Sequence, residues 1–271
     1  MILPVASVVT KKTICEFDLL KLSLEQYHKC EWVISCDAAA SEAYKDVENI
    51  KCLQLIETDD CDHNIASPEQ KDNWMKVMMT KFDGVRALIE DHGHPLFLDS
   101  DMIFVGPIED EVLQLFSNET VDAAICQHMT NNWPVEAQHG LYNGGMFHLR
   151  SLEFLDTWVS LSKDYKKHNF YFEQQPLEYV QRNFLSLNLP INYNIGWWRF
   201  NTAQTKTRLN LLHMKEDRLY FGSRPAVNFH VHTLREIGYE NFGQFLVDKI
   251  CELLRQSNTD AHKIILETLE K

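Results

Sequence analysis

The sequence predicts an α/β fold: a central, mostly parallel sheet with helices on both faces and further helices appended at the C-terminal end. Along the first 56 residues, continuous apolar runs alternate with segments whose apolar residues have helical spacing. Glycine and proline number only 10 and 8, so long flexible linkers are not expected. With 45% apolar and 24% charged residues, the composition is globular, and 271 residues can bury a sizeable core. Because no composition shift marks a boundary, we expect one domain over residues 1–271.

The first part of the chain alternates predicted strands with predicted helices. Apolar runs predict strands at 5–9, 31–35 and 50–56, and the residues between them predict helices at 15–28 and 39–46. A β-α-β-α-β order of this kind implies parallel strands with helices packed on the faces of the sheet.

A long helix is predicted over 68–91. Ser67 can cap its first turn, Pro68 suits the first helical position, and Gly93 can end it. Short apolar strands follow at 95–98 and 102–105.

The second half of the chain is less regular. We expect a polar, aromatic loop over 128–142 and two closing helices after about residue 240. The remaining elements predicted there are strands at 123–126 and 145–149 and helices at 151–164 and 174–184.

Charge and apolar patterning exclude several kinds of partner. The net charge of −13 disfavours nucleic acid, whose phosphates call for a basic face, and it disfavours anionic membranes likewise.

The cysteines and the apolar runs indicate where the protein resides. The seven cysteines form no C-x-x-C pair, which favours free thiols in a reducing compartment. The apolar run over 1–9 is too short for a signal peptide, and none reaches the ~18 residues of a membrane helix. We therefore expect a soluble, cytoplasmic protein without an integral membrane segment.

Two aspartates follow the apolar strand at 95–98. In open α/β sheets ligands bind beyond the carboxyl ends of the strands, where Asp99 and Asp101 lie. Two neighbouring carboxylates are costly unless a cation lies between them, and Mn²⁺ or Mg²⁺ commonly takes carboxylates together with substrate phosphates. A second such pair, Asp60 and Asp62, lies in a polar loop, and we assign it to the solvated surface.

The segment 97–104, FLDSDMIF, resembles the Asp-x-Asp segment of GT-A (Rossmann-like) glycosyltransferases, most closely the glycogenin and galactosyltransferase-like retaining group. Other pieces resemble that group in the same order along the chain. They are Lys81, the Asn143-Gly144 strand entry, the Glu173-Gln174 segment and the Phe229-His230 segment. Lys81 also falls on the apolar stripe of its helix, and an inward-facing lysine calls for an anionic partner. These pieces also have ordinary structural interpretations: a simple turn, a polar helix start, a lysine at the helix edge, or histidines on a surface strand.

The resemblance implies a metal-dependent transferase that takes a sugar from a nucleotide-diphosphate donor, UDP by family preference. It implies Mn²⁺ (or Mg²⁺) on Asp99, Asp101 and His230, with His232 as the alternative to His230. The acceptor would be a carbohydrate, glycolipid or protein. The donor would contact eight residues, namely Ser7, Thr10, Asp37, Lys81, Asp99, Ser100, Asn143 and Gly144. Glu173, Gln174 and Asp101 would act at the reacting carbon, and Trp133, Trp197 or Trp198 could stack on a sugar.

Three other functions remain open. A haloacid-dehalogenase-type phosphatase also places Asp-x-Asp after an apolar strand, although usually after its first strand. A sugar nucleotidyltransferase would need a glycine-rich loop, and residues 7–13 contain no glycine. A non-catalytic nucleotide-sugar-binding module is the third alternative, against which the intact acid pair argues.

Overall fold

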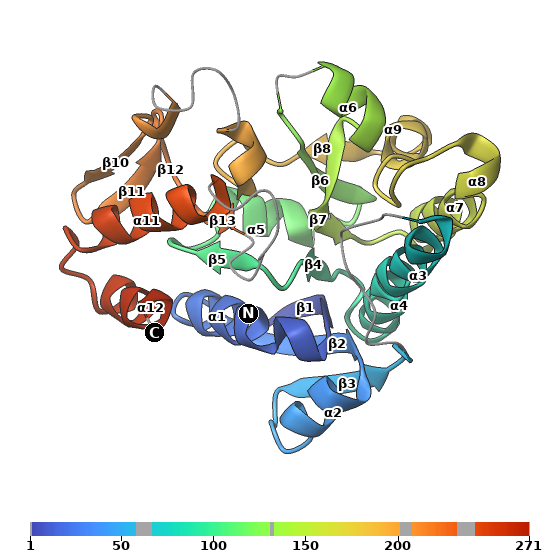
Figure 1. Ribbon diagram of the computed structural model, residues 1–271, viewed down its shortest axis with the longest axis horizontal. Helices are drawn as coiled ribbons and strands as arrows, with labels where there is room; N and C mark the ends of the chain where they lie inside the picture. The colour runs from blue at the N-terminus through green and yellow to red at the C-terminus, as the bar shows by residue number, and fades with distance from the viewer. Residues whose placement is uncertain (1, 58–66, 131–132, 201–207, 232–241, 271) are drawn as a thin grey trace. The chain divides into compact units, whose positions relative to one another are not determined.

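The computed structural model describes residues 2–57, 67–130, 133–200, 208–231 and 242–270 (Figure 1). It divides into two compact units that alternate along the chain, and each is described by itself. Unit 1 comprises residues 1–14, 29–99 and 111–189, and unit 2 comprises residues 15–28, 100–110 and 190–271. That residues 1–271 act as one domain stays a prediction.

A seven-stranded sheet forms the centre of unit 1. Its strands, in spatial order, are β3 (Ile50–Gln54), β2 (Lys29–Cys36), β1 (Ile2–Val9), β4 (Leu96–Leu98), β7 (Tyr142–Leu149), β6 (Ala123–Gln127) and β8 (Ser186–Asn188). The first four are mutually parallel, β8 is parallel to β6, and β7 runs antiparallel to both of its neighbours. The predicted mostly parallel sheet is therefore confirmed, with β7 as the reversed strand.

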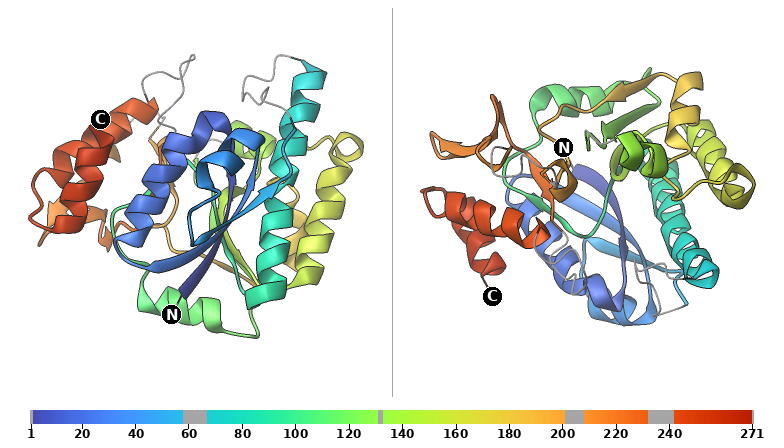
Figure 2. Two further views of the ribbon diagram at one scale, coloured as in Figure 1. Left: turned by 90° about the horizontal axis from the view of Figure 1, so that it is seen from below. Right: turned by 45° about the horizontal axis from the view of Figure 1, so that its top comes forward.

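Helices lie around this sheet, and some of them share a buried apolar cluster with it. In unit 1 the helices are α2 (Ala38–Tyr44), α3 (Pro68–Met79), α4 (Lys81–His92), α5 (Asp110–Ser117), α6 (Trp133–His139), α7 (Leu152–Lys163), α8 (Tyr165–His168) and α9 (Leu177–Val180). Figure 2 shows α4 and α7 side by side along the sheet. Val85 of α4 and Trp158 of α7 belong to one buried cluster with Ala6 and Val33 of the sheet. Because Ala6 and Val8 both join that cluster, strand alternation identifies the face that α4 covers.

The predicted single helix over 68–91 is wrong, because the chain breaks at Thr80 into α3 and α4. The Thr80 amide donates to Val77 O, three residues back, so the last turn of α3 tightens. The Ser35 hydroxyl of β2 donates to the Thr80 carbonyl at 2.7 Å. This contact with a distant strand, which helical periodicity does not reveal, fixes the junction.

Two other expected segments differ in the same unit. The loop predicted over 128–142 contains the helix α6. The helix predicted over 174–184 is limited to α9 and a 3-10 turn, Gln181–Asn183. Side-chain hydrogen bonds explain the shortening. Gln174 Nε2 donates to the His139 carbonyl and Gln175 Nε2 donates to the Ala137 carbonyl, while Gln175 Oε1 accepts from the Tyr171 amide.

Unit 2 contains two three-stranded sheets and the C-terminal helices. One sheet has the order β5 (Met102–Phe104), β13 (Asn228–His230), β9 (Ile195–Gly196), and the other has the order β10 (Leu212–Lys215), β11 (Arg218–Phe221), β12 (Arg224–Pro225). The helices are α1 (Ile14–Glu25), α11 (Phe242–Leu254) and α12 (Asp260–Leu269), and the closing pair is confirmed. Its core joins Leu19 of α1 with Ile103, Phe229 and Ile250.

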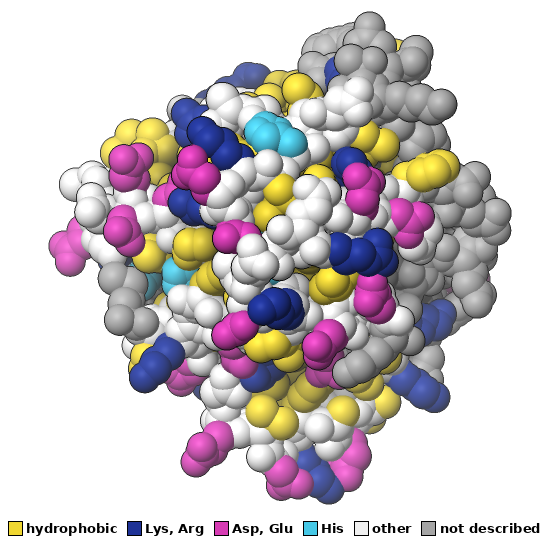
Figure 3. Space-filling view, turned by 90° about the vertical axis from the view of Figure 1, so that its left-hand side faces the viewer, with side chains coloured by type: hydrophobic (Ala, Val, Ile, Leu, Met, Phe, Trp, Pro, Cys, Tyr) yellow, Lys and Arg dark blue, Asp and Glu magenta, His cyan; other side chains and the backbone are white. Residues whose placement is uncertain are grey.

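The surface and the thiols agree with an ordinary globular chain. On the face shown in Figure 3, Lys and Arg side chains are interspersed with Asp and Glu side chains. Six cysteines lie in the described ranges, and all six are free thiols. Within those ranges no helix combines the length and the apolar character needed to span a bilayer.

Candidate functional site

The Asp99-Ser100-Asp101 turn joins β4 of the large sheet to β5 of the small one. The Asp99 amide donates to Gly145 O at 2.8 Å, and the Asp101 carbonyl accepts from the Val231 amide at 3.0 Å. β4 runs parallel to β1, with Phe97 opposite Ala6, so the turn that follows β4 lies at the edge of the sheet where the parallel strands end. Both ends of the turn are thus fixed by backbone contacts.

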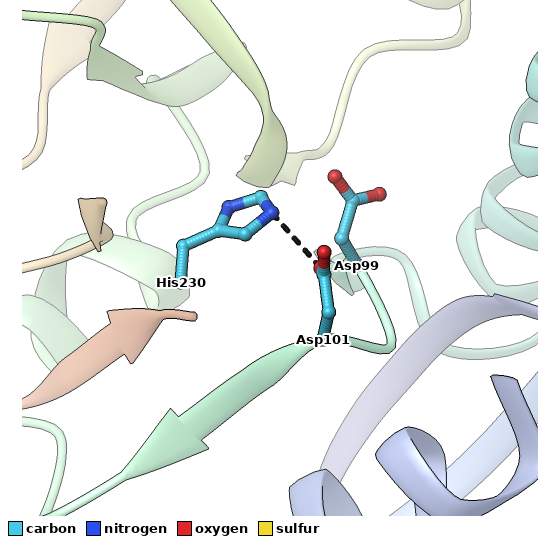
Figure 4. Close-up of side chains that lie close together, drawn as sticks. All are labelled: Asp99, Asp101 and His230. Carbon is cyan, nitrogen blue, oxygen red and sulfur yellow. Dashed lines mark ion pairs between the residues drawn. The ribbon is translucent and has the colours of Figure 1, made fainter. Parts of the chain in front are cut away.

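Three potential metal ligands meet at this turn. One ligand atom from each of Asp99, Asp101 and His230 lies within 4.8 Å of the others (Figure 4). His230 Nε2 lies 2.9 Å from Asp101 Oδ1, and the histidine side chain is only 3% exposed. Two carboxylates and one imidazole at this spacing could hold a divalent cation, which would supply the positive charge that two adjacent carboxylates need.

His230 is held from its other side by residues of unit 2. Its Nδ1 lies 3.0 Å from Asn194 Oδ1. The Trp198 ring meets it edge-on, with ring centroids 5.0 Å apart. Of the tryptophans proposed as sugar platforms, Trp198 is therefore packed beside the candidate ligand. A β-carbon at Gly196 would overlap the Trp198 indole, so glycine is required there.

A second cluster lies within unit 1 and contains Lys81, which faces inward as predicted. Lys81 Nζ lies 2.6 Å from Glu173 Oε1 and 3.3 Å from the Gly144 carbonyl oxygen. The Lys81 and Glu173 side chains are 1% and 6% exposed. The ammonium also lies 4.9 Å from the centre of the Phe97 ring on β4. The predicted anionic partner of Lys81 is thus a residue of the protein itself.

Gly144 packs directly against the acid and the amide of this cluster. Its amide donates to Gln174 Oε1 at 3.0 Å, while Gln174 Nε2 donates to the His139 carbonyl. A β-carbon at Gly144 would lie 3.1 Å from Glu173 Oε1 and 3.2 Å from Gln174 Cβ. The neighbouring Asn143 folds back onto the Gly145 amide at 2.8 Å. Since Gly145 also accepts from Asp99, this cluster adjoins the aspartate turn within unit 1.

Ser7, Thr10 and Asp37 lie at the carboxyl ends of β1 and β2. Asp37 caps α2 through Oδ1, and its Oδ2 accepts from the Lys11 amide at 2.7 Å. Thr10 bonds locally to Thr13. Ser7 Oγ is buried and has no hydrogen-bond partner in the structure as described. The edge position agrees with the prediction, whereas a donor-binding role for these three residues remains a proposal.

Several residues that shape the site were missed by the sequence reasoning. Trp158 Nε1 and Ser162 Oγ of α7 both donate to the Glu173 carbonyl. Asn228 Oδ1 accepts from the Asn194 amide beside His230. The one usable signal was the spacing of Asn228 and His230, which places both on the same side of a strand.

Some expectations concern residues that the structure leaves out. His232, the alternative metal ligand, lies outside the described residues, and so does the second aspartate pair, Asp60 and Asp62. Trp133 opens α6, but its side chain is not described. Trp197 lies in the 3-10 turn Trp197–Arg199 with Trp198.

In the comparison with known protein families, the sequence matches one family model. The model described as nucleotide-diphospho-sugar transferase matches residues 31–214, about two thirds of the chain. A search of curated proteins finds no matching sequence.

Solved glycosyltransferase structures resemble the whole chain. The apo form of GlyE from Streptococcus pneumoniae is 13% identical with a TM-score of 0.59, covering 100% of this chain and 64% of that one. Apo mouse xyloside xylosyltransferase 1 is 12% identical with a TM-score of 0.55, and the match covers 88% of this chain and 100% of that one. The galactosyltransferase LgtC, solved with donor and acceptor sugar analogues, is 12% identical with a TM-score of 0.54, covering 95% and 97%. At such identities the likeness establishes the GT-A fold alone, and this chain spans less than two thirds of the GlyE structure.

Proposed function

The chain belongs to the nucleotide-diphospho-sugar transferase family, and we therefore propose that it moves a sugar from a nucleotide-diphosphate donor, with UDP favoured, to a carbohydrate, glycolipid or protein acceptor. The observation that carries this proposal is the meeting of Asp99, Asp101 and His230 at the carboxyl edge of the sheet. The matched segment 31–214 runs through parts of both units, which supports one transferase domain over residues 1–271.

In this proposal Asp99, Asp101 and His230 hold Mn²⁺ or Mg²⁺, whose charge offsets the negative charge that develops on the leaving diphosphate. Asp99 and Ser100 also line the donor phosphates. The hydrogen bonds at both ends of the turn fix the backbone from which the two carboxylates project before the donor arrives. A preorganised carboxylate pair needs no rearrangement during the reaction, which is the source of its catalytic value.

The cluster around Lys81 is proposed to receive the donor sugar. Asn143 and Gly144 would line the sugar, and the absence of a side chain at Gly144 allows close approach. Glu173 and Gln174 would flank the anomeric carbon. Lys81 forms an ion pair with Glu173 at 2.6 Å, and it adds positive charge to this side of the site. Ser7, Thr10 and Asp37 would meet the nucleotide at the same edge of the sheet.

The family favours a transferase over the phosphatase that the aspartate pair alone left open. A non-catalytic nucleotide-sugar-binding module could share this fold, so the two functions are distinguished by measuring turnover. The prediction of a cytoplasmic location likewise stays a prediction.

A thermal-shift experiment tests the donor proposal directly. The protein is melted with nucleoside diphosphates and nucleotide sugars, each in the presence of Mn²⁺ and of EDTA. A ligand at 100 times its dissociation constant should add about 2.7 kcal/mol to the free energy of unfolding. A metal-dependent shift with UDP supports the proposal, and release of UDP from a UDP-sugar separates an enzyme from a binding module. A cooperative melt without any metal-dependent nucleotide shift would contradict it.

A further inference from the structure

The two ring nitrogens of His230 have different partners. Nδ1 lies 3.0 Å from Asn194 Oδ1, and Nε2 lies 2.9 Å from Asp101 Oδ1. The side-chain oxygen of an asparagine only accepts hydrogen bonds, so this contact requires the proton on Nδ1. The Asp101 carboxylate is an acceptor too, so Nε2 carries a proton when no cation is bound, and a cation held by Asp101 would replace that proton on Nε2 while Nδ1 keeps its own. That is the form in which a histidine can bind a cation through Nε2.

Asn194 is held in an unusual backbone conformation. Its φ is +47°, in the left-handed region that non-glycine residues seldom adopt. Its amide donates to Asn228 Oδ1, and Asn228 lies two residues before His230 on β13. Strand alternation puts the side chains of Asn228 and His230 on the same side of β13, where both reach Asn194. Asn228 therefore holds the backbone of Asn194, and the Asn194 side chain holds the His230 ring.

This small polar network is surrounded by an apolar core. Asn194 and Asn228 are both 0% exposed, and neighbours such as Ile195 and Phe229 belong to the core of unit 2. Burying an amide is costly unless it is hydrogen-bonded, so two fully buried asparagines in such a core call for a specific reason. The edge-on Trp198 ring adds a steric wall beside the imidazole. The ring of His230 is thereby constrained in both orientation and tautomer.

We propose that Asn194 is a positioning residue for the metal: its side-chain oxygen accepts the Nδ1 proton of His230 and so makes Nε2 the nitrogen that would bind a cation held by Asp99 and Asp101. The inference rests on the proposed function, because it presumes that a divalent cation binds there. Loss of such an outer partner of a metal-bound histidine commonly weakens metal affinity by about 10- to 100-fold.

Variants at position 194 separate the hydrogen bond from the backbone. Asn194→Gly removes the acceptor and keeps a residue that adopts positive φ without strain. Asn194→Asp keeps an oxygen acceptor in the same place. Ser257→Ala is the matched control, because Ser257 Oγ lies 2.7 Å from Nδ1 of His262, another buried histidine of unit 2 that is not in the metal cluster.

The experiment is a titration of each metal-free protein with Mn²⁺, followed by electron paramagnetic resonance of the free ion. We expect Asn194→Gly to bind Mn²⁺ about 10- to 100-fold more weakly than the unmodified protein. Asn194→Asp should bind at least as tightly as the unmodified protein, and Ser257→Ala should bind equally. With diamagnetic Mg²⁺ bound, ¹⁵N NMR of His230 should show the proton on Nδ1, and this signature should be lost in Asn194→Gly.

Three outcomes would overturn the inference. One is equal Mn²⁺ affinity in Asn194→Gly and the unmodified protein, and another is a His230 proton on Nε2 in the Mg²⁺-bound protein. The third is an affinity loss in Asn194→Asp as large as in Asn194→Gly. If the unmodified protein binds no Mn²⁺, the metal site of the proposed function fails as well, whereas the other outcomes leave that site intact.

Discussion

Lys81 Nζ and Glu173 Oε1 form an ion pair 2.6 Å long in the interior of unit 1. The pair joins the first residue of α4 to the segment that precedes α9, and the Gly144 carbonyl completes it on β7. Desolvation makes such a pair a weak source of net stability, yet removing one partner leaves an uncompensated buried charge. We therefore infer that the pair is kept for the site it builds.

Replacing Lys81 with methionine should lower the free energy of unfolding by about 3–5 kcal/mol, because Glu173 would be left as an unpaired buried carboxylate. Denaturant unfolding measures this loss. Arg86→Met is the matched control on the same helix: its pair with Asp156 is largely exposed, so the change should stay within about 1 kcal/mol.

The double variant Lys81→Met/Glu173→Leu distinguishes a structural pair from a functional one. It should recover a large part of the lost stability, since both charges are removed together. Release of UDP from a UDP-sugar should nevertheless remain absent. Recovered turnover in the double variant would show that the pair has no part in the reaction.

Gly196→Ala should disturb the wall beside His230. The new methyl group would overlap the Trp198 indole, and overpacking of this kind costs about 1–3 kcal/mol. Thermal unfolding gives the loss of stability, and a Mn²⁺ titration should show weaker binding. Adding Trp198→Leu should relieve the overlap and restore part of the stability. Gly84→Ala is the comparison: its β-carbon would lie 3.3 Å from Ser35 Oγ, which a shift of a few tenths of an ångström relieves, so its loss of stability should be smaller and Mn²⁺ binding should be unchanged.

Asp101→Asn should abolish the Mn²⁺-dependent part of the nucleotide thermal shift while the protein still melts cooperatively. An amide removes the negative charge and leaves a side chain that can still bond to His230. The control is Asp164→Asn, at an exposed acid of unit 1. A metal-dependent shift of undiminished size in Asp101→Asn would exclude this carboxylate as a ligand.

His148 should make the protein less stable as the pH falls. Burial, together with neighbouring His94 and Arg150, lowers the pKa of this histidine from 6.5 to about 3. Between those values the unfolded chain binds a proton that the folded protein does not, so the free energy of unfolding decreases with decreasing pH. From pH 7 to pH 5 this one residue should remove about 2 kcal/mol.

His148→Phe tests this linkage, because a phenyl ring can keep the stacking on Phe116, whose ring lies 4.3 Å away. The stability difference between the variant and the unmodified protein should grow by about 2 kcal/mol in favour of the variant between pH 7 and pH 5. His213→Phe replaces an exposed histidine and serves as the control. A pH dependence that is the same in all three proteins would rule out His148 as its source.

Local sequence patterns predicted most of the sheet. Apolar runs identify β1 and β2 to within a few residues, since a buried parallel strand must be apolar on both faces. The edge strand β3 is only partly buried, yet its alternating residues are recognised as well. Their alternation with helices also implied the parallel order. The break at Thr80 escaped the same reasoning, because a hydrogen bond from Ser35, 45 residues away in the chain, holds it.

The candidate site shows the same division. Asp99 and Asp101 could be identified because they follow an apolar strand, and Lys81 because it interrupts an apolar stripe. Asn194, by contrast, stands in an irregular segment, and its importance comes from contacts with Asn228 and His230, 34 and 36 residues later. No periodicity connects residues that meet only after folding.

The sequence by itself determined the α/β class, the β-α-β-α-β order of the first 56 residues, the aspartate turn at the end of β4 and the inward direction of Lys81. Each of these depends on neighbours along the chain, on strand or helix periodicity, or on a resemblance carried by short motifs. Only the tertiary structure decided that Glu173 is the partner of Lys81, that β7 runs against its neighbours, and that Asn194 holds His230. These are long-range contacts of buried polar groups and strands, and their pairing is selected when the whole core closes around them.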